Sequence, residues 1–179
     1  MVTMDKKQLR KGVRARLSAM TDEMKRVASQ NIVSAVKERV LLSGARVVAL
    51  FSPLPDEPQI SSLLTELSVT MVVAVPRVEG DIMQFYRYSG DSMCTGSFGI
   101  EEPQDMPRVE PCEIDLMVVP GVAFTKEGAR MGRGKGFYDK YMSREGFRAY
   151  KIGICYSAQV VDDLPQEEHD IKMDCVIYR

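Results

Sequence analysis

The residues best suited to chemistry lie in one short segment, GARMGRGKGFYDKY, at positions 128–141. Its fourteen residues include four glycines, two arginines and two lysines. Closely spaced glycines let a backbone approach an anion, and their N–H groups can surround it beside the start of a helix. Arg130, Arg133 and Lys135 supply positive charge for a phosphate. The segment therefore predicts a phosphate-binding loop.

The segment departs from both standard phosphate-binding motifs. A P-loop needs glycine five residues before its Gly-Lys pair and Ser or Thr after it, but Ala129 and Gly136 occupy these positions. In a dinucleotide fingerprint, Phe137 would stand where the third glycine belongs. Composition alone favours a mobile surface turn with solvated charges equally well. Phe137 and Tyr138 favour the binding loop, because bulky aromatic residues that open a helix would anchor it.

Asp139 follows these aromatic residues near the predicted helix start. It is either a favourable charge in the first helical turn or a ligand for Mg²⁺. Mg²⁺ beside a polyphosphate is commonly held by only one or two protein carboxylates. Both interpretations stay open from the residues alone.

Charge is unevenly distributed, although the formal net charge is only -1. Between Lys126 and Lys151, eight Lys or Arg residues accompany three acids, a local balance of +5 (8 minus 3). Between Asp91 and Asp115, seven acids accompany one arginine. This pattern favours a local basic site for an anionic ligand over a general nucleic-acid surface, which normally makes a whole domain basic.

The rest of the composition excludes several classes of protein. The chain has 179 residues, 45% hydrophobic and 27% charged, which fits one globular domain spanning residues 1–179. No apolar run predicts a signal peptide or membrane span. The four cysteines form no CxxC pair and there is one histidine, so neither zinc nor a Cys-His catalytic pair is favoured. Reduced thiols predict a cytoplasmic protein.

Strands and helices are predicted to alternate. Apolar, β-branched runs predict strands at 46–51, 70–76, 114–120 and 149–156, and alternation predicts an edge strand at 82–88. Helical spacing of apolar residues predicts helices over 9–20, 22–41 and 60–67, with another starting near 137. These elements predict an α/β fold of three layers, α/β/α, with a mostly parallel central sheet. Its ligand would bind beyond the carboxyl ends of the strands, where the loop after 114–120 would lie.

The segment PGVAFTKEGARMGRGKGFYDKYM, at 120–142, resembles the signature of the 5-formyltetrahydrofolate cyclo-ligase family. The segments KKQLR, VALFSPLPDEP, VAVPRV, GSFGIEEP and GICYSAQVVDDLPQEEHDIKMDCVIY resemble the family in the same order, so the resemblance spans essentially the whole chain. It implies an enzyme that uses ATP and Mg²⁺ to cyclise 5-formyltetrahydrofolate to 5,10-methenyltetrahydrofolate. The formyl oxygen would be phosphorylated, and ADP and phosphate would be released.

The resemblance also implies roles for individual residues. Catalysis would depend on Arg133 and Lys135. The residues implied in ATP binding are Lys6, Arg10, Arg130, Met131, Gly132, Arg133, Gly134, Lys135, Gly136, Phe137 and Tyr138. Those implied in folate binding are Ser52, Glu57, Arg133, Gly134, Lys135, Gly136 and Phe137. Asp139 and Asp174 would hold Mg²⁺.

We expect a monomer that acts on a small-molecule folate, including its polyglutamylated forms, with no nucleic-acid or membrane partner. Two residues depart from the family pattern. Many relatives carry aspartate at the position of Thr125, so a metal or orienting role of that carboxylate is missing here. Pro58 replaces a branched aliphatic residue, which could shift the loop around the substrate.

Plainer structural roles compete with several of these assignments. Lys6 and Arg10 lie opposite the apolar side of a helix and could belong to a solvated face. Glu57 could begin a helix, and Asp174 could be a charge at a strand end. Aromatic residues are more often core than ligand contacts, which applies to Phe137, Tyr138 and three further tyrosines considered as pterin neighbours, Tyr86, Tyr88 and Tyr156.

Two other classes of function also compete. A sugar-phosphate isomerase or an acyl-transfer protein could share the layered fold, but would need a clear general base or a carboxylate nucleophile. A non-catalytic RNA-binding protein could use the basic residues 6–16. The sequence pI of about 5.9 argues against it, because phosphate contacts dominate RNA affinity.

Overall fold

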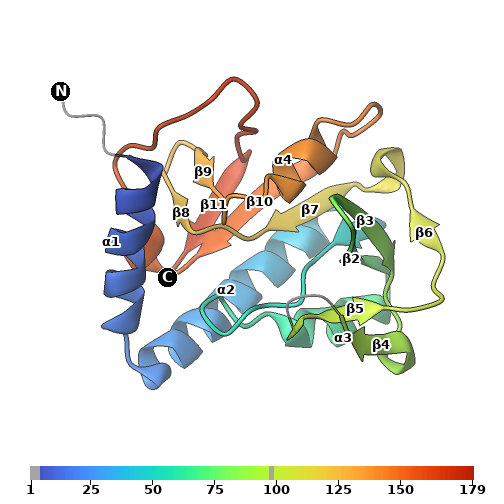
Figure 1. Ribbon diagram of the computed structural model, residues 1–179. Helices are drawn as coiled ribbons and strands as arrows, with labels where there is room; N and C mark the ends of the chain where they lie inside the picture. The colour runs from blue at the N-terminus through green and yellow to red at the C-terminus, as the bar shows by residue number, and fades with distance from the viewer. Residues whose placement is uncertain (1–4, 97–98) are drawn as a thin grey trace.

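The computed structural model describes residues 5–96 and 99–179, and its centre is a seven-stranded sheet. The strand order is β11-β10-β7-β1-β2-β3-β6 (Figure 1). Five strands run parallel: β1 (Val47–Ala49), β2 (Val72–Glu79), β7 (Leu116–Val119), β10 (Tyr150–Cys155) and β11 (Cys175–Tyr178). The strand β3 (Ile82–Arg87) runs antiparallel to β2, and β6 (Arg108–Val109) runs antiparallel to β3. The predicted mostly parallel sheet is confirmed.

The prediction that residues 82–88 form an edge strand is wrong. Phe85 and Tyr86 of β3 pair with β6, so the two-residue β6 lies at that edge instead. Two residues carry no detectable periodicity, which is why the sequence did not reveal β6. Nearby, β4 (Met93–Thr95) and β5 (Glu101–Pro103) form a small separate sheet. Part of the GSFGIEEP segment, Ser97 and Phe98, lies outside the described residues.

The predicted helices are present with adjusted bounds. They are α1 (Lys6–Ser18), α2 (Asp22–Ser43), α3 (Ser61–Ser68) and α4 (Phe137–Met142). Thr21 caps α2 as its side chain accepts a hydrogen bond from the Met24 N–H at 3.2 Å, and Gly44 ends this helix with φ +71°. Within residues 5–96 and 99–179, no helix is long and apolar enough to cross a membrane.

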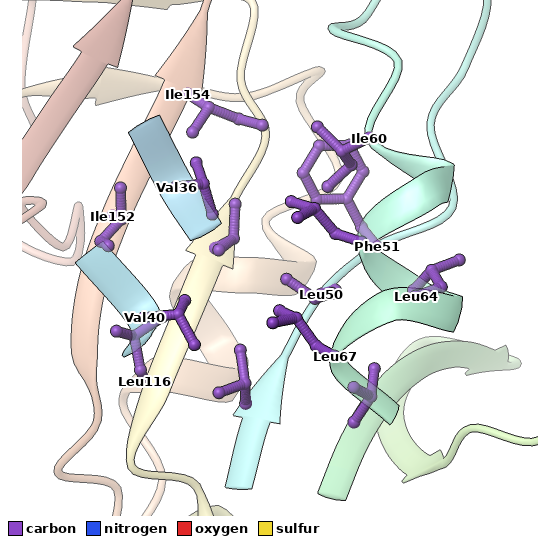
Figure 2. Close-up of a cluster of buried hydrophobic side chains, with 14 of the residues drawn as sticks. Val36, Val40, Leu50, Phe51, Ile60, Leu64, Leu67, Leu116, Ile152 and Ile154 are labelled. Atoms are coloured by element: carbon purple, nitrogen blue, oxygen red, sulfur yellow. The ribbon is translucent and has the colours of Figure 1, made fainter. Parts of the chain in front are cut away.

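Helices cover both faces of the sheet, as the three-layer prediction requires. On one face, Val36 and Val40 of α2 lie near Leu116 and Ile152 of the sheet, and Leu67 of α3 lies beside Leu50 (Figure 2). The core residues of this face are nearly all fully buried. Full burial of such a side chain contributes about 1.5–3 kcal/mol, so this layer holds the strands in place.

The opposite layer is thinner and surrounds the glycine-rich segment. It contains Tyr141 and Met142 of α4, together with Phe124 and Met173 from long connections. Phe124 belongs to β8 (Ala123–Phe124), which pairs with β9 (Arg130–Met131) in a hairpin. The glycine-rich segment therefore begins in a hairpin strand, which was not predicted.

The helix α1 packs at the end of the molecule against this hairpin. Its apolar residues Leu9, Val13 and Leu17 share a cluster with Met131 and Tyr156. Figure 1 shows α1 beside β8 and β9 and apart from the faces covered by α2 and α3. This packing places the basic side of α1 next to the glycine loop.

The four thiols should differ sharply in reactivity. Cys94 and Cys112 are exposed, whereas Cys155 is buried at the end of β10, where burial raises its pKa to about 12. The thiolate is the reactive form. At pH 8 we therefore expect a disulfide reagent to label Cys94 and Cys112 rapidly and Cys155 only after unfolding in urea.

The raised pKa of Cys155 also makes the free energy of unfolding depend on pH. An unfolded thiol ionises near about pH 8.5, so the unfolded chain loses this proton first as the pH rises. The contribution of Cys155 to the free energy of unfolding is complete below that pH and is lost as the pH rises towards about 12. Labelling of Cys155 in the native protein as fast as Cys94 would contradict the predicted difference in thiol reactivity.

Candidate active site

A cavity of about 440 Å³ lies beyond the carboxyl ends of β1 and β7, where the sheet topology predicted a ligand site. Its volume is in the range of about 300–1,000 Å³ that is typical of small-molecule sites. Its apolar lining is Phe51, Leu54, Pro76, Val78, Met83, Ile100, Pro120, Phe137 and Tyr138. Its charged lining is Glu57, Glu102, Arg130, Arg133 and Lys135. The cavity therefore offers an apolar chamber with charges of both signs at its walls.

Glu57 is the buried carboxylate of the Pro-rich turn, with only 5% of its surface exposed. One carboxylate oxygen, Oε2, accepts a hydrogen bond from the Leu54 N–H at 3.0 Å. The other, Oε1, accepts from Arg133 Nε at 3.3 Å and Nη2 at 3.0 Å. Because a buried charge is costly unless paired, these contacts offset the cost of burying the Glu57 carboxylate at the cavity wall. It does not begin a helix, because α3 starts at Ser61.

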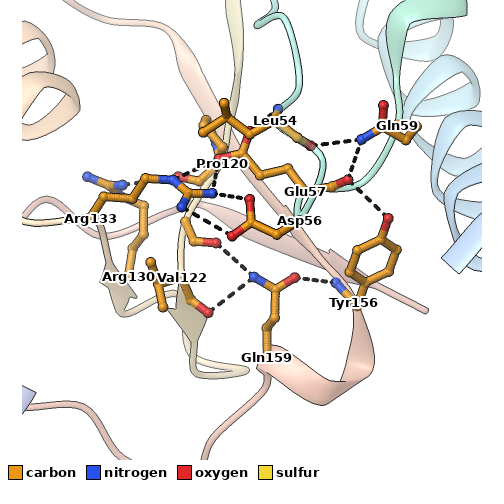
Figure 3. Close-up of polar contacts among 11 residues, drawn as sticks. Leu54, Asp56, Glu57, Gln59, Pro120, Val122, Arg130, Arg133, Tyr156 and Gln159 are labelled. Atoms are coloured by element: carbon orange, nitrogen blue, oxygen red, sulfur yellow. Dashed lines mark hydrogen bonds and ion pairs between the residues drawn. The ribbon is translucent and has the colours of Figure 1, made fainter. Parts of the chain in front are cut away.

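A second set of hydrogen bonds, made by Tyr156 and its neighbours, holds the Pro-rich turn in place (Figure 3). The buried Tyr156 hydroxyl donates to the Glu57 carbonyl at 3.0 Å and lies 3.1 Å from Ser29 Oγ. Ser29 Oγ in turn accepts from the Gln59 N–H at 3.0 Å. Gln159 accepts from the Tyr156 N–H at 2.9 Å, and its Nε2 donates to carbonyls of the segment after β7. The network joins two walls of the cavity.

Removal of the Tyr156 hydroxyl should destabilise the protein. In Tyr156→Phe, the Glu57 carbonyl and Ser29 lose a buried partner, so we expect the free energy of unfolding to fall by about 1–3 kcal/mol. Tyr141→Phe is the matched control, because the Tyr141 hydroxyl is buried without a hydrogen-bond partner among the described residues. Urea unfolding of both variants checks this, and an equal loss in both would contradict it.

The glycine loop proper lies between β9 and α4. Gly134 and Gly136 adopt φ of +105° and +67°, which side chains rarely tolerate. Arg10 of α1 supports the loop, because its Nε donates to the Gly132 carbonyl at 3.2 Å. The exposed Lys135 lines the cavity and forms no ion pair within the described part of the chain. The loop thus presents to the cavity, from a supported backbone, a cation that has no ion-pair partner among the described residues.

Arg133 bridges the glycine loop and the Pro-rich turn. Besides Glu57, it binds Asp56, with Nη2 to Oδ1 at 2.6 Å and Nη1 to Oδ2 at 3.2 Å. Burial acts to lower the pKa of Arg133, but hydrogen bonding to Asp56 and the charge of Glu57 raise it overall. Asp56 was not among the predicted site residues, since an exposed acid in a turn carries no distinguishing local signal.

Arg130 is buried, with 3% of its side chain exposed. Its Nη1 donates to the Pro120 carbonyl at 3.0 Å and its Nη2 to Asp139 Oδ2 at 2.8 Å. Its Nε is buried without a partner among residues 5–96 and 99–179. The guanidinium also lies 5.5 Å from the centre of the Tyr138 ring. Burial, followed by the charge of Glu57, raises the pKa of Tyr138, so this phenol stays protonated at neutral pH.

The structure does not bring the predicted metal ligands, Asp139 and Asp174, together. Asp139 binds Arg130 and accepts from the Ile171 N–H at 3.1 Å. Asp174 precedes β11 and binds the Lys151 N–H at 2.7 Å and its ammonium at 2.8 Å. Within the described ranges, no group of three or more His, Cys, Asp or Glu side chains could hold a metal ion. Each of the two carboxylates is thus paired with a cation in the structure, and a magnesium role for either stays a prediction.

Five other predicted site residues have defined surroundings in the structure. Lys6 does not lie on a solvated face, because its ammonium binds Glu167 at 3.0 Å and Asp170 at 3.2 Å. Arg10 contacts the loop backbone. Met131 is buried in the cluster under α1. Gly134 lies between the loop residues that line the cavity. Ser52 lines it and donates to the Glu101 carbonyl at 2.9 Å.

The family departure at Thr125 has a structural explanation. Thr125 is buried in the turn between β8 and β9, where its Oγ1 accepts from the Ala129 N–H at 3.2 Å. It therefore supports the hairpin.

The three tyrosines considered as pterin neighbours have structural contacts. Tyr86 stacks on Arg77, and Tyr88 packs against the core. Tyr156 donates a hydrogen bond to the Glu57 carbonyl.

Comparison with known proteins decides between the classes of function left open. Residues 2–179 match the 5-formyltetrahydrofolate cyclo-ligase family. The chain belongs to this family. The 5-formyltetrahydrofolate cyclo-ligase of Haemophilus influenzae is 29% identical, and the match covers 97% of each chain. A shorter match to the Saccharomyces cerevisiae enzyme of that name is 42% identical over 89 residues, which is 46% of this chain and 41% of the yeast protein.

A solved relative of the cyclo-ligase family has the same fold. The 5,10-methenyltetrahydrofolate synthetase of Aquifex aeolicus is 35% identical and superposes with a TM-score of 0.87 over 98% of this chain and 90% of that one. The α/β fold class is confirmed by this similarity. Because the relatives carry the names of enzymes, family membership places the chain among enzymes and favours catalysis over the RNA-binding alternative.

Proposed function

We propose that the chain catalyses ATP- and Mg²⁺-dependent cyclisation of 5-formyltetrahydrofolate to 5,10-methenyltetrahydrofolate, with release of ADP and phosphate. One observation carries the proposal: a single cavity joins an apolar chamber with a buried carboxylate to a glycine loop with cationic side chains. A reduced pterin is flat and carries N–H donors at one edge, which suit Glu57 and the apolar walls. Phosphates suit Lys135, Arg133 and the loop backbone.

The proposed reaction needs charge neutralisation more than a protein nucleophile. The formyl oxygen attacks the γ-phosphorus, and the bond from that phosphorus to the bridging oxygen of ADP breaks. Nitrogen-10 then attacks the activated formyl carbon and loses its proton, and the former formyl oxygen leaves within inorganic phosphate. Lys135 and Arg133 would offset the charge that develops on the phosphoryl oxygens. This explains why a cavity without a Ser-His or Cys-His pair can be catalytic.

The residues around Arg130 would set the geometry of the loop. Asp139 fixes the guanidinium against the Pro120 carbonyl, and the buried Nε has no hydrogen-bond partner among the described residues. Mg²⁺ is expected to arrive with the nucleotide, because Mg²⁺ on substrate phosphates usually keeps several waters and few protein ligands. The polyglutamylated substrate, the monomeric state and the cytoplasmic location stay predictions.

The test is formation of methenyltetrahydrofolate, followed by absorbance with 5-formyltetrahydrofolate, ATP and Mg²⁺. We expect product only when ATP is present, with one phosphate released per turnover. Substrate carrying ¹⁸O in the formyl group should yield ¹⁸O-labelled phosphate. No product from folded protein would refute the activity, whereas product with unlabelled phosphate would refute only the phosphorylation step.

A further inference from the structure

Arg133 is held by two carboxylates that differ in how easily they can be displaced. Glu57 is anchored, since 7% of its side chain is exposed and the Leu54 N–H binds its second oxygen. Asp56 has 44% of its side chain exposed, and Arg133 is its only partner among the described residues. An exposed ion pair is weak, because water can replace it at little cost.

No nitrogen of the Arg133 guanidinium is left without a carboxylate. Nε binds Glu57, Nη1 binds Asp56 and Nη2 binds both (Figure 3). These bonds use four of the five N–H groups of the guanidinium, so one carboxylate must give way before Arg133 can donate two hydrogen bonds to a phosphate. The anchored Glu57 cannot do so without leaving a buried charge unpaired, so Asp56 is the one released.

We propose that Asp56 is an internal competitor for the nucleotide, which occupies Arg133 in the empty site and is displaced by a phosphate group of ATP. This inference rests on the proposed function. Asp56, Glu57 and Arg133 together carry a net charge of -1 (two acids, one base), which opposes the approach of a polyanion until Asp56 swings into solvent. Asp56 thus sets the affinity of the cavity for nucleotide.

The test is calorimetric titration with ATP and Mg²⁺. Loss of the competing charge in Asp56→Asn should tighten ATP binding by about two- to tenfold, since exposed ion pairs and nearby like charges have effects of this size. Asp56→Glu keeps the charge and should bind much as the unchanged protein does. Glu23→Gln is the matched control, because Glu23 also forms an exposed ion pair, with Arg26, and its neutralisation changes the net charge equally; ATP binding should not change.

The same substitution in an Arg133→Gln protein separates competition for Arg133 from general electrostatic repulsion of ATP. With Arg133→Gln present, there is no guanidinium to compete for, so adding Asp56→Asn should tighten ATP binding by less than twofold. Weaker or unchanged binding in Asp56→Asn would mean that Asp56 positions Arg133, and equal tightening in both backgrounds would mean simple repulsion; each would overturn the inference. No ATP binding by the unchanged protein would overturn the proposed function and this inference with it.

Discussion

Replacing Lys135 with alanine is expected to lower kcat for methenyltetrahydrofolate formation by about 10²–10³-fold, which is the usual cost of removing one group that stabilises transition-state charge. Lys135 is exposed, lines the cavity and forms no ion pair in the described part of the chain. Its ammonium can therefore bind a phosphate, and its removal leaves no group among the described residues without a partner. The fold should be unaffected. Steady-state kinetics and a thermal unfolding curve check both statements.

Lys140→Ala is the matched control for this experiment. Lys140 is also exposed and lies one helical turn along α4, yet it does not line the cavity. It should retain nearly full activity, whereas Lys135→Arg should recover part of the lost kcat because the charge is kept. A fall of less than threefold in Lys135→Ala would show that this cation does not act in the chemical step.

Gly128→Ala should produce the largest loss of stability among the substitutions considered. Gly128 has φ +95°, and a Cβ there would lie 2.3 Å from the Met173 carbonyl oxygen. The same residue accepts a hydrogen bond from the Met173 N–H at 2.8 Å. Left-handed backbone costs about 1–2 kcal/mol in a residue with a side chain, and overpacking adds about 1–3 kcal/mol. We therefore expect a loss of about 2–5 kcal/mol in the free energy of unfolding.

Gly44→Ala separates the two contributions. Gly44 also has positive φ, at +71°, but a Cβ there would meet nothing within 4 Å. It should cost only about 1–2 kcal/mol, the backbone part alone. At about 2–4 °C per kcal/mol for a chain of this size, the difference is measurable by thermal unfolding. Equal shifts in Tm would show that the Met173 segment moves aside without cost.

The strands and helices that leave a local pattern in the sequence were predicted from it. The apolar runs at β1, β2, β7 and β10 and the cap of α2 are local features, and each has a counterpart in the structure. The glycine loop was found by composition, because few other segments combine glycine with positive charge so densely.

Contacts between distant segments could not be predicted in the same way. Asp139 was assigned to a metal by residue type, but its partners in the structure are Arg130 and a backbone N–H from 32 residues further along the chain. The alternative of a solvated face for Lys6 is wrong, because the side chain is paired with acids more than 160 residues away. The support that Tyr156 gives to Glu57 spans 99 residues. Such pairs depend on the assembled fold, and no local periodicity reveals them.

The position of α1 has a consequence for how the protein is made. The first helix contacts the last third of the chain, through Arg10 to Gly132 and Lys6 to Asp170, across separations of 122 and 164 residues. During synthesis α1 leaves the ribosome before these partners, so its bonds to Gly132 and Asp170 can form only after those later segments have emerged. Closing such long loops is slow compared with forming local structure. We expect β1, β2 and β3 to pair earlier, and the glycine-loop end of the cavity to be among the last parts of the protein to assemble.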